Sequence, residues 1–168
     1  MKKTAIIYSF HTKKTGKIAE KIKEEFNDEA IEMVNAEEIT EEQFLAYDQA
    51  ILGVPTWFDG ELPNYWDEFV PALEEMDLKG KKYAIYGLGD QKGYPENFQD
   101  GIGLMAEILE EQGAEIVGFT STEGYTYERS GGVRDNEFVG LAIDYENQAS
   151  KNKPRIAAWV AGLREKFD

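Results

Sequence analysis

The sequence predicts a doubly wound α/β fold, in which helices cover both faces of a parallel sheet. Short apolar runs alternate along the chain with segments whose apolar residues recur at helical spacing. Polar or glycine-containing turns follow several of these runs. Because alternating strands and helices build parallel sheets, 168 residues with five such strands fit a three-layer sandwich of strand order 2-1-3-4-5. We expect one domain over residues 1–168.

Each expected strand is a short run of mainly apolar residues. The five sheet strands are expected at Thr4–Ser9, Ala30–Val34, Gln49–Val54, Lys82–Leu88 and Glu115–Ser121. A polar, glycine-containing segment at about 122–137 follows, and then a strand-like piece, Phe138–Ile143.

The expected helices carry apolar residues on one face. They are placed at Thr15–Phe26, from Thr40 through Leu45, from Pro63 to Leu73, at Asn97–Gln112 and from Ile156 to Phe167. Thr40 and Gln43 have the spacing of a capping box, and Gly113 stands where helices often end. Pro71 fits poorly inside its helix.

Composition limits the classes of partner. Thirty-three acidic residues against eighteen basic ones give a net charge of −15, which argues against nucleic acid or an anionic membrane as a partner. The same charge would steer a basic protein toward the chain, or serve solubility alone. The chain has no cysteine, and no apolar run approaches the roughly 20 residues of a membrane span. We expect a cytoplasmic protein.

The fold predicts where a ligand binds. In doubly wound sheets the site lies at the carboxyl ends of the strands, where the winding reverses. Here that point lies between the first and third strands. The loops that begin at Ser9, Pro55 and Gly89 should therefore build the site.

The first of these loops suits a phosphate. It runs Ser9-Phe10-His11-Thr12-Lys13-Lys14-Thr15 into a helix, whose free N–H groups and dipole favour an anion. It matches neither a P-loop nor a dinucleotide-binding turn. The alternative is a hydroxyl-rich loop that only caps the helix. No carboxylate partner for His11 is evident in the sequence, so we expect it to neighbour the phosphate and not to act as a catalytic base.

The other two loops each carry an exposed aromatic residue. A planar ring stacked between Trp57 and Tyr94 would bury large aromatic surfaces, although the two could instead cover the sheet's end or form a protein interface. The amide-bearing segment 94–100 could contact the polar edge of a heterocycle. Together with the phosphate loop, these features describe a pocket for flavin mononucleotide (FMN), with no catalytic residue and no metal site.

Several motifs in order resemble the flavodoxin family, long-chain type, over nearly the whole chain. They are Pro55-Thr56-Trp57 with Gly60-Glu61-Leu62, Gly87 to Asp90 with Gly93-Tyr94, Asn97 to Asp100, and Phe138 to Ala142 with Asp144 and Asn147-Gln148. Segment 122–137 resembles the insertion into the fifth strand that marks long-chain members.

The resemblance implies non-covalent FMN binding and low-potential transfer of single electrons. It implies that Trp57 and Tyr94 flank the isoalloxazine ring, and that a peptide of the 57–60 turn, with its carbonyl at Phe58, responds to reduction. The cofactor-binding residues expected on both grounds are Ser9, Phe10, His11, Thr12, Lys13, Lys14, Thr15, Pro55, Thr56, Trp57, Phe58, Asp59, Gly60, Leu88, Gly89, Asp90, Tyr94, Asn97, Phe98, Gln99, Asp100 and Glu146.

The phosphate loop departs from the family pattern, Thr/Ser-x-Thr-Gly-x-Thr. In a gapless alignment Thr12 and Thr15 match, whereas Phe10 removes a hydroxyl and Lys13 replaces a glycine. Lys13 or Lys14 could compensate by a charge-assisted contact with the phosphate. Leu88 and Glu146 are smaller departures, standing where Thr and Asp are common in the family.

The resemblance implies an electron carrier that serves basic redox proteins, such as a flavodoxin/ferredoxin-NADP reductase, and low-potential acceptor enzymes. We expect a monomer that is not an enzyme. One alternative is an FMN-dependent NAD(P)H:quinone reductase on the same fold. Another is an interaction module without flavin, which the altered phosphate loop would favour.

Overall fold

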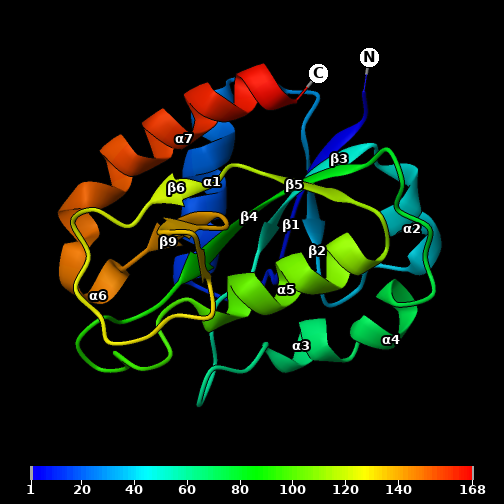
Figure 1. The fold of residues 1–168 in the computed structure, drawn as a ribbon. Coiled ribbons are helices and arrows are strands. Elements are labelled where there is room, and N and C mark those ends of the chain that lie inside the picture. Colours follow the sequence, from blue (N-terminus) through cyan, green and yellow to red (C-terminus); the bar gives the residue numbers. More distant parts are fainter. Residues whose placement is uncertain (1, 168) are drawn as a thin grey trace.

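A parallel sheet forms the centre of the computed structural model, which describes residues 2–167 (Figure 1). Its strands run in the order β2 (Glu32–Asn35), β1 (Thr4–Tyr8), β3 (Gln49–Gly53), β4 (Lys82–Leu88) and β5 (Glu115–Val117). In the register of the first strand, Tyr8 pairs with Asn35 and Ile7 with Leu52. The predicted order 2-1-3-4-5 is confirmed.

Helices cover both faces of the sheet, as predicted (Figure 1). One face carries α1 (Lys14–Phe26) and α7 (Asn152–Lys166), and the other carries α2 (Glu41–Ala46), α3 (Asn64–Asp67), α4 (Val70–Leu73) and α5 (Asp100–Glu111). The short helices α6 (Tyr145–Gln148) and η1 (Ala149–Lys151) precede α7. Between residues 2 and 167, no helix combines the length and apolar character that crossing a bilayer requires.

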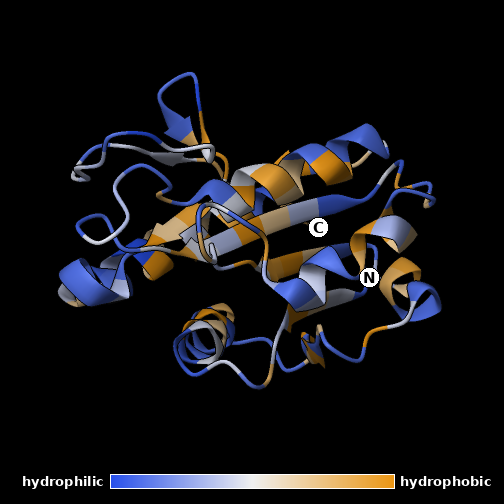
Figure 2. Cartoon of the chain, turned by 90° about the horizontal axis from the view of Figure 1, so that it is seen from below, coloured by the Kyte–Doolittle hydropathy of each residue, from blue (hydrophilic) through white to orange (hydrophobic). Residues whose placement is uncertain are grey.

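Successive side chains of a strand point to opposite faces of the sheet, so the core consists of two layers, one on each face. In β1, Ala5 and Ile7 pack with α2, α3, α4 and α5, whereas Ile6 and Tyr8 pack with α1 and α7. All five residues of this strand are buried, as expected for a parallel sheet covered on both sides. Figure 2 shows the apolar residues concentrated on the strands and on helix faces, with hydrophilic loops around them.

The fifth strand is interrupted, as predicted. β5 pairs with β4 only over Lys82–Ala84, and β9 (Leu141–Ile143) pairs with the rest of β4, over Tyr86–Leu88. Between them, β6 (Thr120–Ser121), β8 (Glu137–Phe138) and β7 (Val133–Arg134) form a small antiparallel sheet. The chain leaves the main sheet at Gly118, whose φ of 85° suits glycine. The two continuous strands expected at 115–121 and 138–143 are each split in consequence.

Two predicted helices differ in extent. The helix expected from Pro63 to Leu73 is two four-residue helices, α3 and α4, with Pro71 in the first turn of the second, where a missing N–H costs least. The helix expected from Asn97 begins at Asp100, because Gln99 takes a left-handed φ of 62°. Residues 97–99 thereby become part of the loop after β4. The predicted cap is present, since the Thr40 hydroxyl accepts from the Gln43 N–H at 3.1 Å.

Candidate functional site

The loops after β3 and β4 enclose a pocket of about 360 Å³ at the carboxyl end of the sheet. This volume lies within the usual range for small-molecule sites. The residues that line it, all among those the sequence assigns to the flavin, are Thr56, Trp57, Phe58, Gly89, Asp90, Tyr94, Asn97 and Phe98.

Trp57 and Tyr94 supply aromatic surface to this pocket from different loops. Trp57 is half-buried and is held edge-on against Tyr65, with ring centroids 5.8 Å apart. Tyr94 is 59% exposed, and a turn closed by its N–H to the Asp90 carbonyl, at 2.9 Å, fixes its backbone. The two rings therefore offer a planar ligand one preset wall and one wall open to solvent.

The turn between Trp57 and Glu61 is closed tightly. Each of these residues donates its N–H to the other's carbonyl, at 2.8 and 2.7 Å. Within the turn Phe58 has a φ of 50°, which is strained for a residue with a side chain, and Gly60 has a φ of 89°. A Cβ on Gly60 would collide with the Asp100 carboxylate. Asp59 is exposed at the tip.

Asp90 is held in its ionised form by the loop around it. Its carboxylate accepts from the Gly93 N–H at 2.8 Å, from the Asn147 amide at 2.8 Å and from the Lys92 N–H at 3.1 Å. These hydrogen bonds, that from Gly93 above all, lower the pKa of Asp90 below its ordinary value. A fixed negative charge therefore lies at the pocket wall.

A fully buried carboxylate, Asp144, anchors this loop from beneath. It accepts from the backbone N–H of Gln91 at 3.1 Å, from the Gln91 side-chain amide at 2.7 Å and from the Asn147 N–H at 3.0 Å. Gln91 is itself buried, and its amide oxygen accepts from the Thr126 N–H at 2.5 Å. The loop that carries Tyr94 is thus tied to the start of α6 and to the insertion.

Of residues 97–100, two line the pocket and two hold the loop in place by hydrogen bonds. Phe98 is 1% exposed, presents part of its ring to the pocket and packs against Tyr127 at 5.5 Å. Gln99 is fully buried outside the lining, and its amide donates to the Ile143 carbonyl at 3.0 Å. Asp100 also lies outside the lining and accepts from the Gly131 N–H at 2.6 Å. Gln99 and Asp100 hold the loop, whereas Asn97 and Phe98 face the cavity.

The strand ends supply further support. The Thr56 hydroxyl accepts from the Gly101 N–H at 2.8 Å, and its own N–H donates to the Leu88 carbonyl at 3.3 Å. The Gly89 N–H donates to the Ile143 carbonyl at 3.0 Å. Pro55 is buried beneath the pocket, and Leu88 is half-buried. The ring pocket therefore rests on main-chain hydrogen bonds that join β3, β4, α5 and β9.

The first half of the phosphate loop has its donors occupied. The N–H groups of Phe10, His11 and Thr12 donate to the Asn35 side chain at 3.2 Å, to the Ser9 hydroxyl at 3.3 Å and to the Ser9 carbonyl at 3.1 Å. The Thr12 hydroxyl also donates to the Ser9 carbonyl, at 2.6 Å. Phe10 points outward, 49% exposed, with its ring 5.0 Å from that of Tyr8.

The second half presents donors. The N–H groups of residues 13–16 have no protein partner within the described chain, as expected where α1 begins. Thr15 is 3% exposed, and its carbonyl accepts from the buried Tyr86 hydroxyl at 2.9 Å, which fixes this turn. Such a row of N–H groups at a helix start suits a phosphate. Of the residues predicted to bind phosphate, those nearer α1 therefore have the available backbone N–H groups.

The helix α6 joins the two parts of the site. Lys14 pairs with the Glu146 carboxylate and lies over the Tyr145 ring at 5.7 Å. The next residue, Asn147, donates to Asp90. One short helix therefore contacts both the phosphate loop and the pocket wall. Lys13 is exposed and forms no ion pair with the described residues.

His11 has the carboxylate partner that the sequence did not reveal. Its Nδ1 contacts the Glu37 carboxylate, which also accepts from the Ser9 hydroxyl at 3.0 Å. The contact with Glu37 raises the pKa of the His11 imidazole and lowers the pKa of the Glu37 carboxyl. The imidazole is exposed, and the neighbouring Ser9 hydroxyl donates to Glu37 and not to the imidazole, so a non-catalytic role for His11 remains our expectation.

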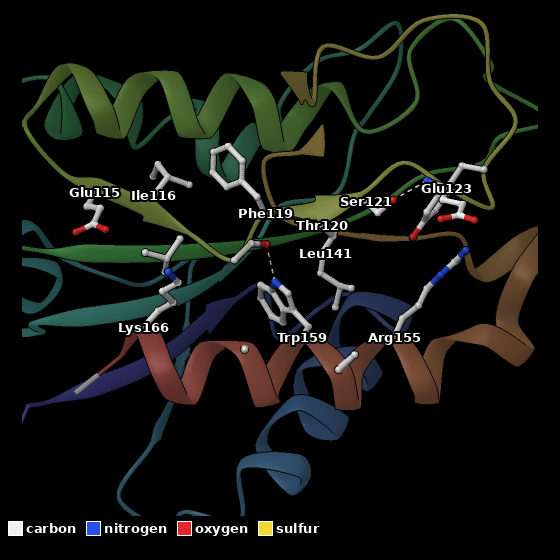
Figure 3. A pocket seen from close by; sticks show the side chains of 15 residues that line it. Glu115, Ile116, Phe119, Thr120, Ser121, Glu123, Leu141, Arg155, Trp159 and Lys166 are labelled. Carbon is white, nitrogen blue, oxygen red and sulfur yellow. Dashed lines mark hydrogen bonds between the residues drawn. The ribbon is translucent and has the colours of Figure 1, made fainter. Parts of the chain in front are cut away.

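A larger cavity, of about 730 Å³, lies between β5 and α7 (Figure 3). Its walls include Ile116, Leu141 and Trp159, and the Trp159 indole donates to the Gly118 carbonyl at 2.7 Å. Charges of both signs stand around it, and it is lined by none of the predicted flavin-binding residues. The loop chemistry, and not the cavity size, therefore identifies the candidate site.

Among the supporting residues outside the sequence-based set are Asn35, Glu37, Gln91, Asp144 and Asn147. Asn35, Glu37, Asp144 and Asn147 bond to a site loop from a distant part of the chain, whereas Gln91 lies within the loop after β4 and joins it to Asp144 and Thr126. Asp144 carried a signal, because it belongs to a motif of the family resemblance. Nothing local to Glu37 marks it, since acidic residues are common throughout this chain.

Comparison with known proteins agrees with this geometry. The family model described as Flavodoxin matches residues 6–159. A flavodoxin of Synechococcus elongatus is 42% identical over 168 residues, which cover 99% of both chains. The Fusobacterium nucleatum flavodoxin bound to flavin mononucleotide has a TM-score of 0.94 and 33% identity, with both chains fully covered. Its K13G mutant, also bound to flavin mononucleotide, matches with the same TM-score and identity, over 100% of this chain and 98% of that one. The chain therefore belongs to the flavodoxin family.

Proposed function

We propose that this protein binds FMN non-covalently and carries single electrons at low potential between a reductase and acceptor proteins. The observation that carries the proposal is the pairing of an aromatic-walled pocket with unpartnered N–H groups at the start of α1, in a chain of the flavodoxin family. The FMN-bound state of the Fusobacterium nucleatum relative supports it. When bound, FMN would supply the one-electron chemistry.

The described residues suit the parts of FMN. Trp57 and Tyr94 would stack on the ring, and Asn97 and the backbone near Gly89 would contact its edge. The N–H groups of residues 13–16, with the hydroxyl of Thr15, would hold the phosphate. Lys13 would add charge without being essential, by analogy with the K13G mutant of the Fusobacterium relative, which is bound to flavin mononucleotide.

The same residues would tune the reduction potential. Asp90 is kept ionised at the pocket wall and Asp59 lies at the tip of the neighbouring turn, so added negative charge on the ligand would be disfavoured. The strained backbone at Phe58 and the freedom of Gly60 would let the turn redirect a carbonyl toward a protonated ring nitrogen. The two acidic side chains and the turn would thus change the reduction potential of FMN without accepting or donating electrons themselves.

The partners and setting follow from charge and composition. With a net charge of −15, the carrier would recognise basic redox proteins, such as a flavodoxin/ferredoxin-NADP reductase and low-potential acceptor enzymes. We propose a monomeric, cytoplasmic protein in which residues 1–168 act as one FMN-binding domain. The alternative of an NAD(P)H:quinone reductase is not favoured by the relatives, which are named as flavodoxins.

Anaerobic reductive titration of the FMN-loaded protein tests this proposal. We expect two separate one-electron steps, with a long-lived intermediate that absorbs at long wavelength and a second step at much lower potential. Direct two-electron bleaching, steady NADPH oxidation by the pure protein, or failure to bind FMN would contradict it.

A further inference from the structure

Glu37 stands at the centre of the contacts that fold back the first half of the phosphate loop. It lies in the turn after β2, 28 residues from Ser9 along the chain, and its side chain is 33% exposed. One of its oxygens accepts from the Ser9 hydroxyl and contacts His11 Nδ1. Ser9 in turn accepts from the His11 N–H, at 3.3 Å. A single carboxylate therefore holds two residues of the loop.

These contacts occupy the Ser9 hydroxyl and, in His11, the backbone N–H and the ring nitrogen Nδ1. The Ser9 hydroxyl, 1% exposed as a residue, donates to Glu37 and would have to leave it to reach a phosphate. Only the half of the loop nearer α1 keeps unpartnered N–H groups. The backbone N–H groups available to a phosphate therefore lie in that half, whereas the Glu37 carboxylate contacts the other half of the same loop.

We propose that Glu37 is a positioning residue of the phosphate loop, and that with His11 it sets how strongly the protein prefers FMN to riboflavin, which lacks the phosphate. The proposal rests on the proposed function. An ionised Glu37 repels a phosphate dianion, and a protonated His11 neutralises that repulsion. The preference for FMN therefore weakens as the pH rises and His11 loses its proton.

Among the other charged groups near His11, Glu38 raises its pKa as Glu37 does, and the nearby lysines keep their charge over the pH range of the test. From the turn after β2, Glu38 adds a second negative charge that acts on His11. On the loop itself, Lys13 and Lys14 are cations, and Lys14 is paired with Glu146. The contact with Glu37 raises the pKa of His11 above its ordinary value, so its charge changes above about pH 6.5. The second ionisation of the FMN phosphate has its midpoint near about pH 6 and is about nine-tenths complete by about pH 7, so measurements above about pH 7 report mainly on His11.

Dissociation constants for FMN and riboflavin, measured with the apoprotein between pH 6.5 and 9, test the proposal. The Glu37→Gln variant keeps an acceptor for Ser9 and loses the charge. We expect it to bind FMN about threefold more tightly than the wild type near pH 9, with unchanged riboflavin affinity and a flatter pH dependence. Glu38→Gln is the matched control, because it removes the same charge one residue away without a bond to Ser9 or His11, and it should change FMN affinity less.

Three outcomes would overturn the proposal. Glu37→Gln could leave the ratio of the two affinities unchanged at every pH, it could weaken both ligands equally, or Glu38→Gln could reproduce its effect in full. In each of these cases the wild type still binds FMN, so the proposed function survives. A wild type that binds no FMN would overturn both. NMR titration of His11 in the ligand-free protein gives a separate readout, in which Glu37→Gln should lower the His11 pKa.

Discussion

The ring pocket and the phosphate loop are built in different ways, although they are expected to bind one ligand. The pocket rests on buried groups: Asp144 and Gln99 are fully buried, and Gln91 is nearly so. The phosphate loop is held from its outer side by exposed contacts, those of His11 with Glu37 and of Lys14 with Glu146. The pocket is therefore fixed by the core, whereas the loop responds to solvent, salt and pH.

The difference separates stability from recognition. Removing a buried hydrogen-bond partner leaves desolvated groups unpaired, which costs far more than removing an exposed ion pair. Substitutions beneath the pocket should therefore change both folding and FMN binding. Substitutions of the exposed residues of the phosphate loop should change FMN binding more than stability, to an extent that depends on pH and salt.

The largest effect is expected from Asp144→Ala. It leaves the buried donors of Gln91 without an acceptor, so the free energy of unfolding should fall by about 3 kcal/mol and FMN affinity should fall with it. Urea unfolding and FMN titration measure the two. Glu96→Ala, an exposed acid of the same loop, should change stability by less than about 0.5 kcal/mol. Equal stability of both variants would contradict the anchoring role.

Tyr94→Ala should weaken FMN binding by about 2 kcal/mol, or roughly 30-fold, through the loss of one stacking surface. Because Tyr94 is 59% exposed, the stability of the apoprotein should change little. Phe119→Ala, at an aromatic residue 37% exposed beside β5, is the control and should leave FMN affinity unchanged. A parallel loss in both variants would show that Tyr94 is not a specific wall of the pocket.

Gly60→Ala should destabilise the apoprotein by about 2 kcal/mol, because alanine is strained at a φ of 89° and its Cβ meets Asp100. Gly80→Ala separates the two causes. Gly80 has a similar φ of 82° but nothing within 4 Å of its Cβ position, so about 1 kcal/mol is expected there. Thermal unfolding measures the stability of both variants. Equal losses of stability would mean that the Asp100 side chain moves away from the new Cβ at no energetic cost.

The double variant Lys13→Ala, Lys14→Ala should reduce FMN affinity by about threefold at low salt and less at high salt, since both lysines are exposed. Riboflavin affinity should not change. Isothermal titration at two salt concentrations measures the effect. If FMN affinity shows neither a loss nor an altered salt dependence, the lysines do not contact the phosphate.

The smallest expected effect is a difference in pH dependence between the phosphate loop and the ring pocket. The raised pKa of His11 means that its contact with Glu37 is favourable below about pH 6.5 and is lost as the pH rises through the folded-state value. The lowered pKa of Asp90 means that its contacts persist above about pH 3.8 and are lost only as the pH falls through its folded-state value. Between about pH 6 and 9, amide NMR signals of residues 9–12 should therefore shift while that of Gly93 stays constant. Joint movement would contradict this.

Sequence reasoning located the pocket well for a physical reason. Parallel strands end at the same edge of a sheet, so Trp57 and Tyr94 could be brought together from the strand pattern alone. It misjudged features that depend on single backbone angles, such as the start of α5, which the left-handed Gln99 delays. It also missed Glu37, because a partner 28 residues away leaves no local pattern.

The position of β9 has a consequence for how the molecule is made. Asp144 follows β9 directly, so the anchor of the loop after β4 lies beyond the whole insertion in the chain. The ribosome synthesises a chain from its amino terminus, at about 5–20 residues per second. Trp57, Tyr94 and the phosphate loop are all synthesised before this anchor exists. We expect a nascent chain to acquire a firm hold on its cofactor only after its carboxyl-terminal segment has emerged and docked.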